Sequence, residues 1–472
     1  MSLAGLGSAG NGQAATVRVP SQFVGIQAAI DVAQNSDTVL ISRGTYAGNL
    51  VISGKSLTLA SQYIVTGDTN DIALTTISGG STILTIDASA GPSTTIRGLT
   101  FLDGGYQIEN YARRVNILDV HFIGGGTDQM SFEGAGGVVR GCRFEGAGDD
   151  AIDVDNASDP VIENNTILNA GDDGMELRLH PHTGALLQIV FRNNFVSGCK
   201  EDGIQLIDYA GASSRDFLIE GNVITNCSKV GLACMADGNT IENYLGAPLV
   251  EPVRVIGNTL CGNPTGVTGG DNMLLLNNII MGCSTVAMKR IATSSFVSHT
   301  DLCNNTSSWV NSNVDMASTL WANPRLDTDY TLQGGSPCID AGAISVPWNG
   351  KKVSAGPYLG TAPDLGARES DAGSVVSVPR PSQRTGMAID SVRPNPASSD
   401  VAIAFTLRES APARLELMDP AGRRILVHEL GALSPGGHVA KLPAGRTLPA
   451  GVYLVRLVQG DRAVAAQVVI ER

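Results

Sequence analysis

A short motif repeats along the first three quarters of the chain, and its period constrains the fold more than any other feature. Each copy is a short apolar strand broken by a polar or glycine residue, as in TIRGLTF (95–101) and VIENNTI (161–167). The equivalent positions are Gly98, Asp119, Gly141, Asn164, Asn193, Gly221, Gly257 and Asn277. They are separated by 21, 22, 23, 29, 28, 36 and 20 residues. Strands this short cannot bury an apolar face alone, so the period predicts a solenoid whose three-stranded coils stack on one another.

The asparagines of the motif are expected to support this stacking. Side chains in equivalent positions lie about 4.8 Å apart on neighbouring coils, so their amides can form a ladder that satisfies backbone groups at the turns. We predict this structural role for Asn164, Asn165, Asn193 and Asn194.

The two ends of the repeat region resemble a known superfamily. The opening segment is VPSQFVGIQAAIDVAQNSDTVLISRGTYAGNLVISGKSLTLAS (19–61), and the closing segment runs from DYTLQGGSPCIDAGA (329–343) to APDLGARE (362–369). With the repeats between them, they resemble the pectin-lyase-like right-handed parallel β-helix superfamily over residues 15–370. The resemblance implies an all-β fold with a helix at about 24–34, which caps the exposed end of the solenoid and prevents edge-to-edge pairing.

The C-terminal part of the chain has a different pattern. A Ser/Pro-rich stretch at 371–387 is typical of a linker, and residues 388–472 alternate strands with Pro, Asp and Gly turns. The "PNP" start, the turn at 419–423 and the run Gly-Val-Tyr-Leu at 451–454 resemble bacterial type IX secretion sorting domains and flagellar-hook-capping-like immunoglobulin-type sandwiches. This resemblance implies export through the type IX machinery, or attachment to the cell surface. Residues 1–14 are expected to be a disordered or processed end.

Charge and hydropathy exclude two classes of partner. The formal net charge is −13 and the pI is about 4.9, so a polyanion such as nucleic acid would be repelled. No apolar run reaches the roughly 18 residues that a membrane span needs.

The eight cysteines show no CxxC spacing and are expected to be buried thiols. We expect a secreted monomer whose partner is an extracellular polysaccharide.

Acidic residues stack on one face when five coil segments are aligned by their strands. The segments begin at residues 126, 148, 171, 200 and 228. Side chains alternate along a strand, so one outward column contains Ser131, Asp153, Glu176, Gln205 and Ala233, and the next contains Glu133, Asp155, Arg178, Ile207 and Met235. Two turn columns contain Asp128, Asp150, Asp173, Asp202 and Val230, and Thr127, Asp149, Asp172, Glu201 and Lys229.

Carboxylates one coil apart repel one another unless they protonate or bind cations. Calcium takes six to eight oxygen ligands in loose geometry, which such a ladder can supply. The predicted calcium ligands are Asp149, Asp150, Asp153, Asp172, Asp173, Glu176, Glu201 and Asp202. The alternatives are a purely structural calcium ion or a solvated acidic ridge.

The coils lengthen only beside this acidic strand. The inserted segments are HPHTGALLQ (180–188), YAGASSR (209–215) and DGNTIENYLGAPLVEP (237–252), and all three follow the same strand of their coil. Three loops on consecutive coils are expected to wall a groove that suits a chain molecule. The predicted groove residues are His180, His182, Gln205 and Tyr209.

Two reactions fit acids in a groove. In β-elimination on a uronate, calcium neutralises the substrate carboxylate and a base removes the adjacent proton. The predicted catalytic residues are Asp173 and the cations Arg178, Lys200 and Lys229, with His180 and His182 as further candidate bases. In glycoside hydrolysis two carboxyl groups act, drawn from Asp150, Asp153, Asp173 and Glu176. The acidic cluster resembles that of calcium-dependent lyases of the pectate type, which favours a lyase. The non-enzymatic alternative is a surface adhesin or carbohydrate-binding β-helix with structural calcium.

Overall fold

The computed structural model describes two separate parts of the chain. In the first part it describes residues 14–370, apart from 135, 210, 212, 236–237, 239–242 and 246–248. In the second it describes residues 387–470, apart from 394–396, 398–400, 408–410, 420–422, 434–435, 443–447, 450 and 461. The chain divides into two compact units, residues 1–377 and 378–472. The N-terminal segment 1–14 and the linker 371–387 that the sequence predicts lie almost wholly outside the described residues.

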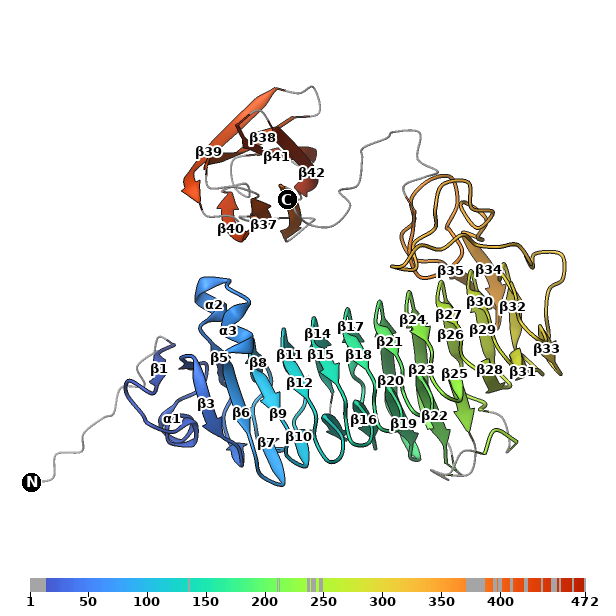
Figure 1. The fold of residues 1–472 in the computed structure, drawn as a ribbon, viewed down its shortest axis with the longest axis horizontal. Coiled ribbons are helices and arrows are strands. Elements are labelled where there is room, and N and C mark those ends of the chain that lie inside the picture. The colour runs from blue at the N-terminus through green and yellow to red at the C-terminus, as the bar shows by residue number, and fades with distance from the viewer. Residues whose placement is uncertain are drawn as a thin grey trace, which may run out of the picture. The chain divides into compact units, whose positions relative to one another are not determined.

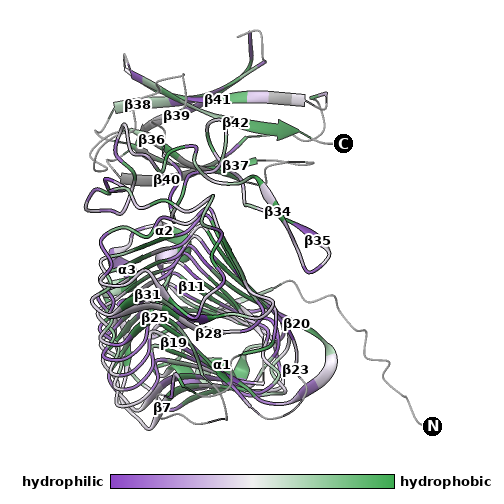
Figure 2. Cartoon of the chain, turned by 90° about the vertical axis from the view of Figure 1, so that its right-hand side faces the viewer, coloured by the Kyte–Doolittle hydropathy of each residue, from purple (hydrophilic) through white to green (hydrophobic). Residues whose placement is uncertain are grey.

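The first unit is a right-handed parallel β-helix, as predicted (Figure 1). Successive strands of the chain enter three parallel sheets in turn, which we call A, B and C. Figure 2 looks along the stack of coils, so that equivalent strands lie behind one another. Each sheet is therefore built from one strand of every coil, and the side chains that point inward form one continuous core.

The strands of each sheet have the following bounds. Sheet A contains β1 (Thr16–Val19), β2 (Thr38–Ile41), β5 (Thr58–Ser61), β8 (Thr95–Arg97), β11 (Val115–Leu118), β14 (Gly137–Arg140), β17 (Val161–Glu163), β20 (His182–Arg192), β23 (Ser213–Glu220), β26 (Val253–Ile256), β29 (Met273–Leu276) and β32 (Phe296–Ser298). Sheet B contains β3 (Gly44–Ala47), β6 (Thr75–Ser78), β9 (Thr100–Leu102), β12 (His121–Ile123), β15 (Arg143–Glu145), β18 (Thr166–Leu168), β21 (Phe195–Ser197), β24 (Val223–Thr225), β27 (Thr259–Cys261) and β30 (Ile279–Met281). Sheet C contains β4 (Leu50–Ile52), β7 (Thr82–Ile86), β10 (Tyr106–Asn110), β13 (Met130–Glu133), β16 (Ile152–Asp155), β19 (Met175–Leu179), β22 (Ile204–Asp208), β25 (Val230–Met235), β28 (Thr265–Gly270), β31 (Val286–Ile291) and β33 (Trp309–Val310).

The turn between sheets A and B explains why Gly, Asn or Asp recurs in the motif. All eight equivalent positions, from Gly98 to Asn277, have a left-handed backbone with φ between 53° and 68°. Glycine adopts this conformation without a steric penalty, and Asn and Asp tolerate it better than other residues. The motif is therefore a turn signal that recurs once per coil.

A ladder of buried asparagines follows this turn. It consists of Asn165, Asn194, Asn222, Asn258 and Asn278. In each step the backbone N–H of one asparagine donates to the side-chain Oδ1 of the next, over 2.8 to 3.1 Å. The predicted ladder is confirmed for Asn165 and Asn194. It is wrong for Asn164 and Asn193, because these two residues hold the left-handed turn position itself.

Aromatic stacking and a helical cap complete the core of the β-helix. Phe101, Phe122 and Phe144 come from consecutive coils, and their ring centroids are 5.6 and 4.4 Å apart. The predicted cap is confirmed as α1 (Ile26–Val32), which buries Ile26, Ala29 and Ile30 against the first coil. Two further short helices, α2 (Tyr63–Thr66) and α3 (Asn70–Ala73), follow β5. The cysteines are free thiols, and all are buried except the half-buried Cys261.

Antiparallel strands are found only towards the C-terminus in the described residues. The hairpin β34 (Ser345–Trp348) and β35 (Lys351–Ser354) packs on the outer face of sheet A. The second unit has one sheet made of β36 (Ala388–Arg393), β37 (Val401–Leu407) and β40 (Gly436–Leu442). Its other sheet is made of β38 (Ala411–Met418), β39 (Arg424–Leu433), β41 (Gly451–Gln459) and β42 (Arg462–Ile470). The two sheets share one apolar core, which is the predicted small β-sandwich.

Candidate functional site

The outward columns of sheet C match the predicted register. Backbone pairing places Ser131 beside Asp153, Asp153 beside Glu176, and Glu176 beside Gln205. Although these side chains point away from the core, Asp153 and Glu176 are each only 3 % exposed. The column is therefore a buried row of polar groups rather than a solvated ridge.

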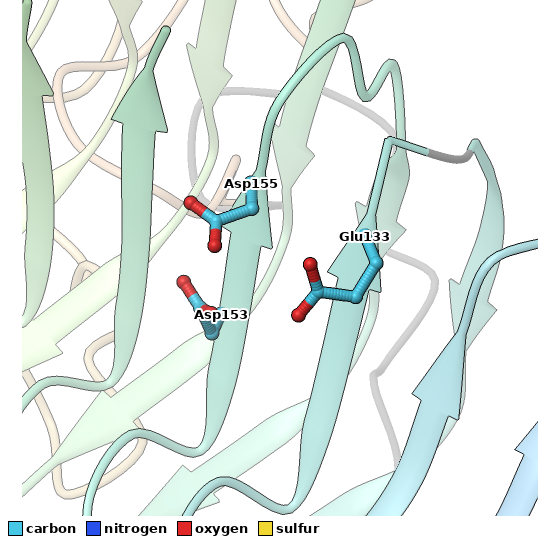
Figure 3. Close-up of side chains that lie close together, drawn as sticks. All are labelled: Glu133, Asp153 and Asp155. Carbon is cyan, nitrogen blue, oxygen red and sulfur yellow. The ribbon is translucent and has the colours of Figure 1, made fainter.

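Asp153 and Asp155 project from β16 beside Glu133 on β13 (Figure 3). One carboxylate oxygen from each of these three residues lies within 4.8 Å of the others. Asp150, Asp153 and Glu176 form a second group with the same property. We call the five residues Glu133, Asp150, Asp153, Asp155 and Glu176 the acidic cluster.

Arg178 is the cation that faces the acidic cluster. Its Nη2 lies 2.6 Å from Glu176 Oε1, and its Nη1 lies 3.4 Å from Asp155 Oδ2 and 3.8 Å from Asp153 Oδ2. These carboxylates raise the pKa of Arg178 further above its ordinary value, against the effect of burial. Arg178 is thus held as a permanent positive charge, which does not suit it to remove a proton from a substrate.

The aspartates of the turn column form a ladder of their own. The N–H of Asp150 donates to Asp128 Oδ1 over 3.2 Å, and the N–H of Asp173 donates to Asp150 Oδ1 over 2.8 Å. The series continues with Asp202 N–H to Asp173 Oδ1 (2.6 Å) and Val230 N–H to Asp202 Oδ1 (2.7 Å). All four aspartates are buried, so they serve the fold as acceptors for the next coil as well as adding negative charge.

Burial raises the pKa values of the acids in this region. The pKa of Asp153 rises to about 9, because desolvation and the nearby Asp155, Asp128 and Glu176 outweigh the opposing effect of Arg178. Desolvation also raises the pKa of Glu176 to about 7, although the positive charge of Arg178 lowers it. Desolvation and neighbouring carboxylates also raise the pKa of Asp150. These groups therefore favour a bound proton or a bound cation over a bare negative charge.

The remaining predicted ligands and bases lie at the turn beside the column. Asp172 approaches Asp149 and Asp150. Burial, followed by the charge of Glu201, raises its pKa to about 6. Glu201 forms an ion pair with Lys229, with 2.5 Å between Oε2 and Nζ. Lys200 is exposed. Of the predicted cations, only Arg178 enters the acidic cluster.

His180 and Tyr209 lie together at the end of the acidic column. Their ring centroids are 4.2 Å apart, and His180 Nε2 lies 3.5 Å from Asp155 Oδ1. Burial, together with the nearby Asp155, Glu176 and Asp153, raises the pKa of Tyr209 although Arg178 opposes this. His182 lies apart from this pair, with its Nε2 2.9 Å from the carbonyl oxygen of Ala185.

Two of the inserted segments form strands where the sequence predicted loops. Residues 182–188 belong to β20, which pairs with β23 from His182 opposite Ser213 onward, with an irregularity before Leu187. Arg215 anchors this extension, since its buried guanidinium donates to the carbonyl oxygens of His180 (2.8 Å) and Asn156 (2.5 Å). These insertions are therefore partly an extension of sheet A, and Arg215 holds the backbone at His180.

The third insertion lies partly outside the described residues, but Tyr244 within it is described. Its hydroxyl donates to Asp202, with oxygen–oxygen distances of 2.9 and 3.1 Å. Gln205 Nε2 also donates to Asp202 over 3.2 Å. Both oxygens of Asp202 are thus engaged by protein groups, which makes it less available to a cation than Asp153.

The acidic cluster fits a hard divalent cation. Asp153 Oδ1 and Gln205 Oε1 are buried and have no hydrogen-bond partner among the described residues. Asp153 Oδ2 faces Arg178, so Oδ1 is the atom left without a counter-charge. The donor set contains only oxygen atoms, as calcium prefers. The residues that would hold such an ion are Asp150, Asp153 and Glu176.

The raised pKa values predict a pH dependence of stability. The pKa values of Asp128, Glu176 and Asp202 are about 6, 7 and 6, each raised first of all by burial, whereas unfolded carboxyl groups titrate near pH 4. Between the unfolded and the folded pKa values, the folded state binds more protons than the unfolded state. The stabilisation that these protons provide is complete below the unfolded pKa, and it is lost as the pH rises through the folded pKa values. In chelator, the melting temperature is expected to fall between about pH 5 and 8. A melting temperature that rises across this range would contradict the assignment.

Sequence reasoning left Glu133 and Asp155 out of the predicted ligands although it placed both in an outward column. The signal was the column itself, since Glu133 pairs with Asp155 and Arg178 on the next coil contacts Asp155. Sequence reasoning also missed the buried Arg215, for which no signal existed, because its partners come from other coils.

Two family models match parts of the chain. Residues 81–245 match the family model of a right handed beta helix region, and residues 391–471 match that of a secretion system C-terminal sorting domain. No curated protein sequence matches the chain. Among solved structures, the A-module of the mannuronan C-5 epimerase AlgE4 from Azotobacter vinelandii has a TM-score of 0.38 and 15% identity, over 66% of this chain and 95% of that chain. This similarity is too weak to support an argument about activity.

The C-terminal match identifies the cellular location. A type IX sorting domain directs the protein to the cell surface or the extracellular space, and it implies contact with the export machinery. This confirms the predicted localisation. In the described part of the chain, no helix combines the length and apolar character that crossing a bilayer requires.

Proposed function

We propose that this secreted protein is a calcium-dependent polysaccharide lyase, which cleaves a uronate-containing chain by β-elimination at the acidic cluster of sheet C. The observation that carries the proposal is the buried Asp153, whose Oδ1 has no hydrogen-bond partner among the described residues, beside Arg178 and the His180–Tyr209 pair. These groups combine cation ligands, a fixed positive charge and an acid–base pair within one small region. Titratable groups with shifted pKa values beside a fixed charge are candidates for acid–base chemistry.

β-Elimination makes three demands on the protein. The substrate carboxylate must be neutralised, a base must take the proton from the adjacent carbon, and the leaving glycosidic oxygen must receive a proton. The C–H and C–O bonds break while a carbon–carbon double bond forms, so no oxidant or water is consumed. A bound calcium ion would supply positive charge against the substrate carboxylate.

The side chains present can meet these demands. Arg178 supplies a second positive charge for the carboxylate, since its guanidinium is fixed by Glu176 and Asp155. His180 has the exposure to reach a substrate, with 36% of its side chain accessible, and we assign it the role of base. Tyr209 remains protonated because its pKa is raised, so it suits the role of acid for the leaving oxygen.

The test is a panel of uronate polymers that differ in sugar and linkage, assayed in calcium for the absorbance of unsaturated chain ends. His180→Ala is expected to lower the rate on the cleaved polymer by about 100-fold or more, as for other general bases. His182→Ala is the matched control and should keep most of the activity, because the imidazole of His182 lies against the carbonyl oxygen of Ala185 rather than against the acidic cluster. A panel without any unsaturated product, or full activity in His180→Ala, would refute the proposal.

One observation supports a non-catalytic role for the acidic residues. The aspartate ladder from Asp128 to Asp202 uses its carboxylates to accept backbone N–H groups, which a purely structural acidic stack would also do. A carbohydrate-binding or adhesin β-helix with structural calcium would bind a polymer of the panel and release no product.

Glycoside hydrolysis is supported by the short spacing of the carboxyl groups. Asp150, Asp153 and Glu176 offer oxygens within 4.8 Å of one another, which is closest to the separation of about 5–5.5 Å found in retaining glycosidases. New reducing ends without unsaturated products would select this reaction over β-elimination.

A further inference from the structure

A second candidate site lies on sheet A, beneath the hairpin β34–β35. Val346 and Trp348 of the hairpin pack on Ile256, Leu274 and Leu276, which point outward from β26 and β29. Beside this contact an open pocket of about 670 Å³ lies between the hairpin and the sheet. Figure 2 shows β34 and β35 on the side of the coil stack that carries β20 and β23, whereas β19 and β25 of sheet C are on another side.

The pocket carries excess positive charge in an acidic chain. It is lined by Lys351, Lys352 and Arg254 on the basic side and by Asp216 on the acidic side. Asp216 is paired with Arg254, with 2.9 Å between Oδ2 and Nη2. Lys351 and Lys352 are exposed, and neither has an ion-pair partner among the described residues. Two positive charges therefore remain for a ligand.

The geometry of the hairpin directs one of these charges towards the sheet. Lys351 is paired with Trp348, so both side chains lie on the same face of the hairpin. Trp348 is anchored, because its Nε1 donates to the carbonyl oxygen of Ser294 over 3.2 Å. Lys351 and Trp348 thus both line the pocket, on a hairpin that Trp348 anchors to the β-helix.

Polar and extended features of the pocket point to a saccharide chain. Asn349 Nδ2 donates to Asn272 Oδ1 over 2.7 Å, so two amides line the pocket close to the indole. Indole faces and amides are the groups that suit sugar rings and hydroxyls. A neighbouring pocket of about 640 Å³ shares Arg254 and Ser354 with the first and extends to Arg192. The two pockets together offer a path for several sugar units.

We propose that this surface binds a carboxylated oligosaccharide, at a site separate from the acidic cluster of sheet C. The lysines would contact the carboxylates, while Trp348 and the amides would contact the sugar rings. Export places the pocket where extracellular polysaccharides occur. The proposal does not require that the acidic cluster cleave anything.

The test measures binding by calorimetry on the full chain carrying Asp153→Asn and in chelator, so that cleavage does not interfere. The probes are a galacturonate hexamer, a neutral glucose hexamer and inorganic phosphate. The galacturonate hexamer is expected to bind, and the double variant Lys351→Ala, Lys352→Ala to weaken it by roughly tenfold, as the loss of two charge-assisted contacts implies. The neutral hexamer and phosphate are expected to bind far more weakly.

The matched control is the double variant Arg18→Ala, Arg113→Ala, which removes two exposed positive charges elsewhere on the β-helix. It should leave the affinity for the hexamer unchanged. Unchanged affinity in the lysine variant, or an equal loss in both double variants, would overturn the site. Phosphate binding as tight as the hexamer would also overturn it, because it would indicate a simple anion site. The lysines are exposed, so the folded state of the variant is checked by its melting temperature.

Discussion

Asp153→Asn is expected to abolish most of the calcium-induced rise in melting temperature and to raise the melting temperature in chelator at pH 8. Asp153 is buried, its pKa is raised to about 9, and its Oδ1 has no protein partner in the described structure. Asparagine keeps the shape of the neutral acid and removes the cost of holding a proton or a negative charge there. It also removes a calcium ligand, and a ligand at 100 times its Kd stabilises a fold by about 2.7 kcal/mol.

The measurement is thermal unfolding with and without calcium, together with calcium titration by calorimetry. Asp31→Asn is the control, because Asp31 is an exposed acid on α1, remote in sequence from the acidic cluster. This variant should show the same response to calcium as the parent protein. An equally large calcium response in Asp153→Asn would show that the ion binds elsewhere, for example at Asp149, Asp150 and Asp172.

The repeat made the β-helix predictable because its signal is a backbone requirement. The left-handed backbone at the turn between sheets A and B favours Gly, Asn or Asp, and the eight equivalent positions from Gly98 to Asn277 all have this backbone conformation and one of these residues. The same register predicted which side chains of sheet C face outward, including Asp153 and Glu176. The roles of neighbouring asparagines were harder to predict. Asn193 and Asn194 have the same side chain, and only the backbone conformation shows which residue holds the turn and which belongs to the ladder.

The inserted segments were predicted less well. Their length interrupts the period, so the sequence offered no register, and 180–188 was assigned to a loop although most of it forms β20. Its pairing with β23 depends on another insertion, 209–215, and on the buried Arg215. Such contacts between insertions are set by tertiary packing, which a local pattern does not record.

The chemistry of the candidate site was predictable only in part. Column alignment placed Arg178 next to the acids. It did not predict the ion pair between Arg178 and Glu176, which holds the guanidinium in its charged form. The contact between His180 and Tyr209 joins two different insertions, so no spacing rule could have indicated it. The sequence therefore located the acidic face, whereas the fold of the insertions brings His180 next to Asp155 and Tyr209.

Asn194→Ala is expected to lower the unfolding midpoint of the β-helix strongly. Asn194 Oδ1 accepts from the backbone N–H and the Nδ2 of Asn165, and Asn194 Nδ2 donates to the carbonyl oxygen of Ile162. Alanine removes the side-chain partner of the Asn165 backbone N–H and of the Ile162 carbonyl oxygen, whereas Asn165 Nδ2 keeps its bond to the carbonyl oxygen of Val139. Each group left unsatisfied costs about 1–3 kcal/mol. Urea unfolding followed by far-UV circular dichroism measures the midpoint.

Asn193→Gly is the matched control, because it changes the adjacent asparagine but not the ladder. Asn193 is exposed and has a φ of 54°, a conformation that glycine adopts without strain. Its midpoint should therefore stay close to that of the parent protein. If Asn194→Ala were as stable as Asn193→Gly, the ladder would contribute little. Coil stacking would then depend on the apolar core and the strand hydrogen bonds, and the asparagines would serve only to set the register of neighbouring turns.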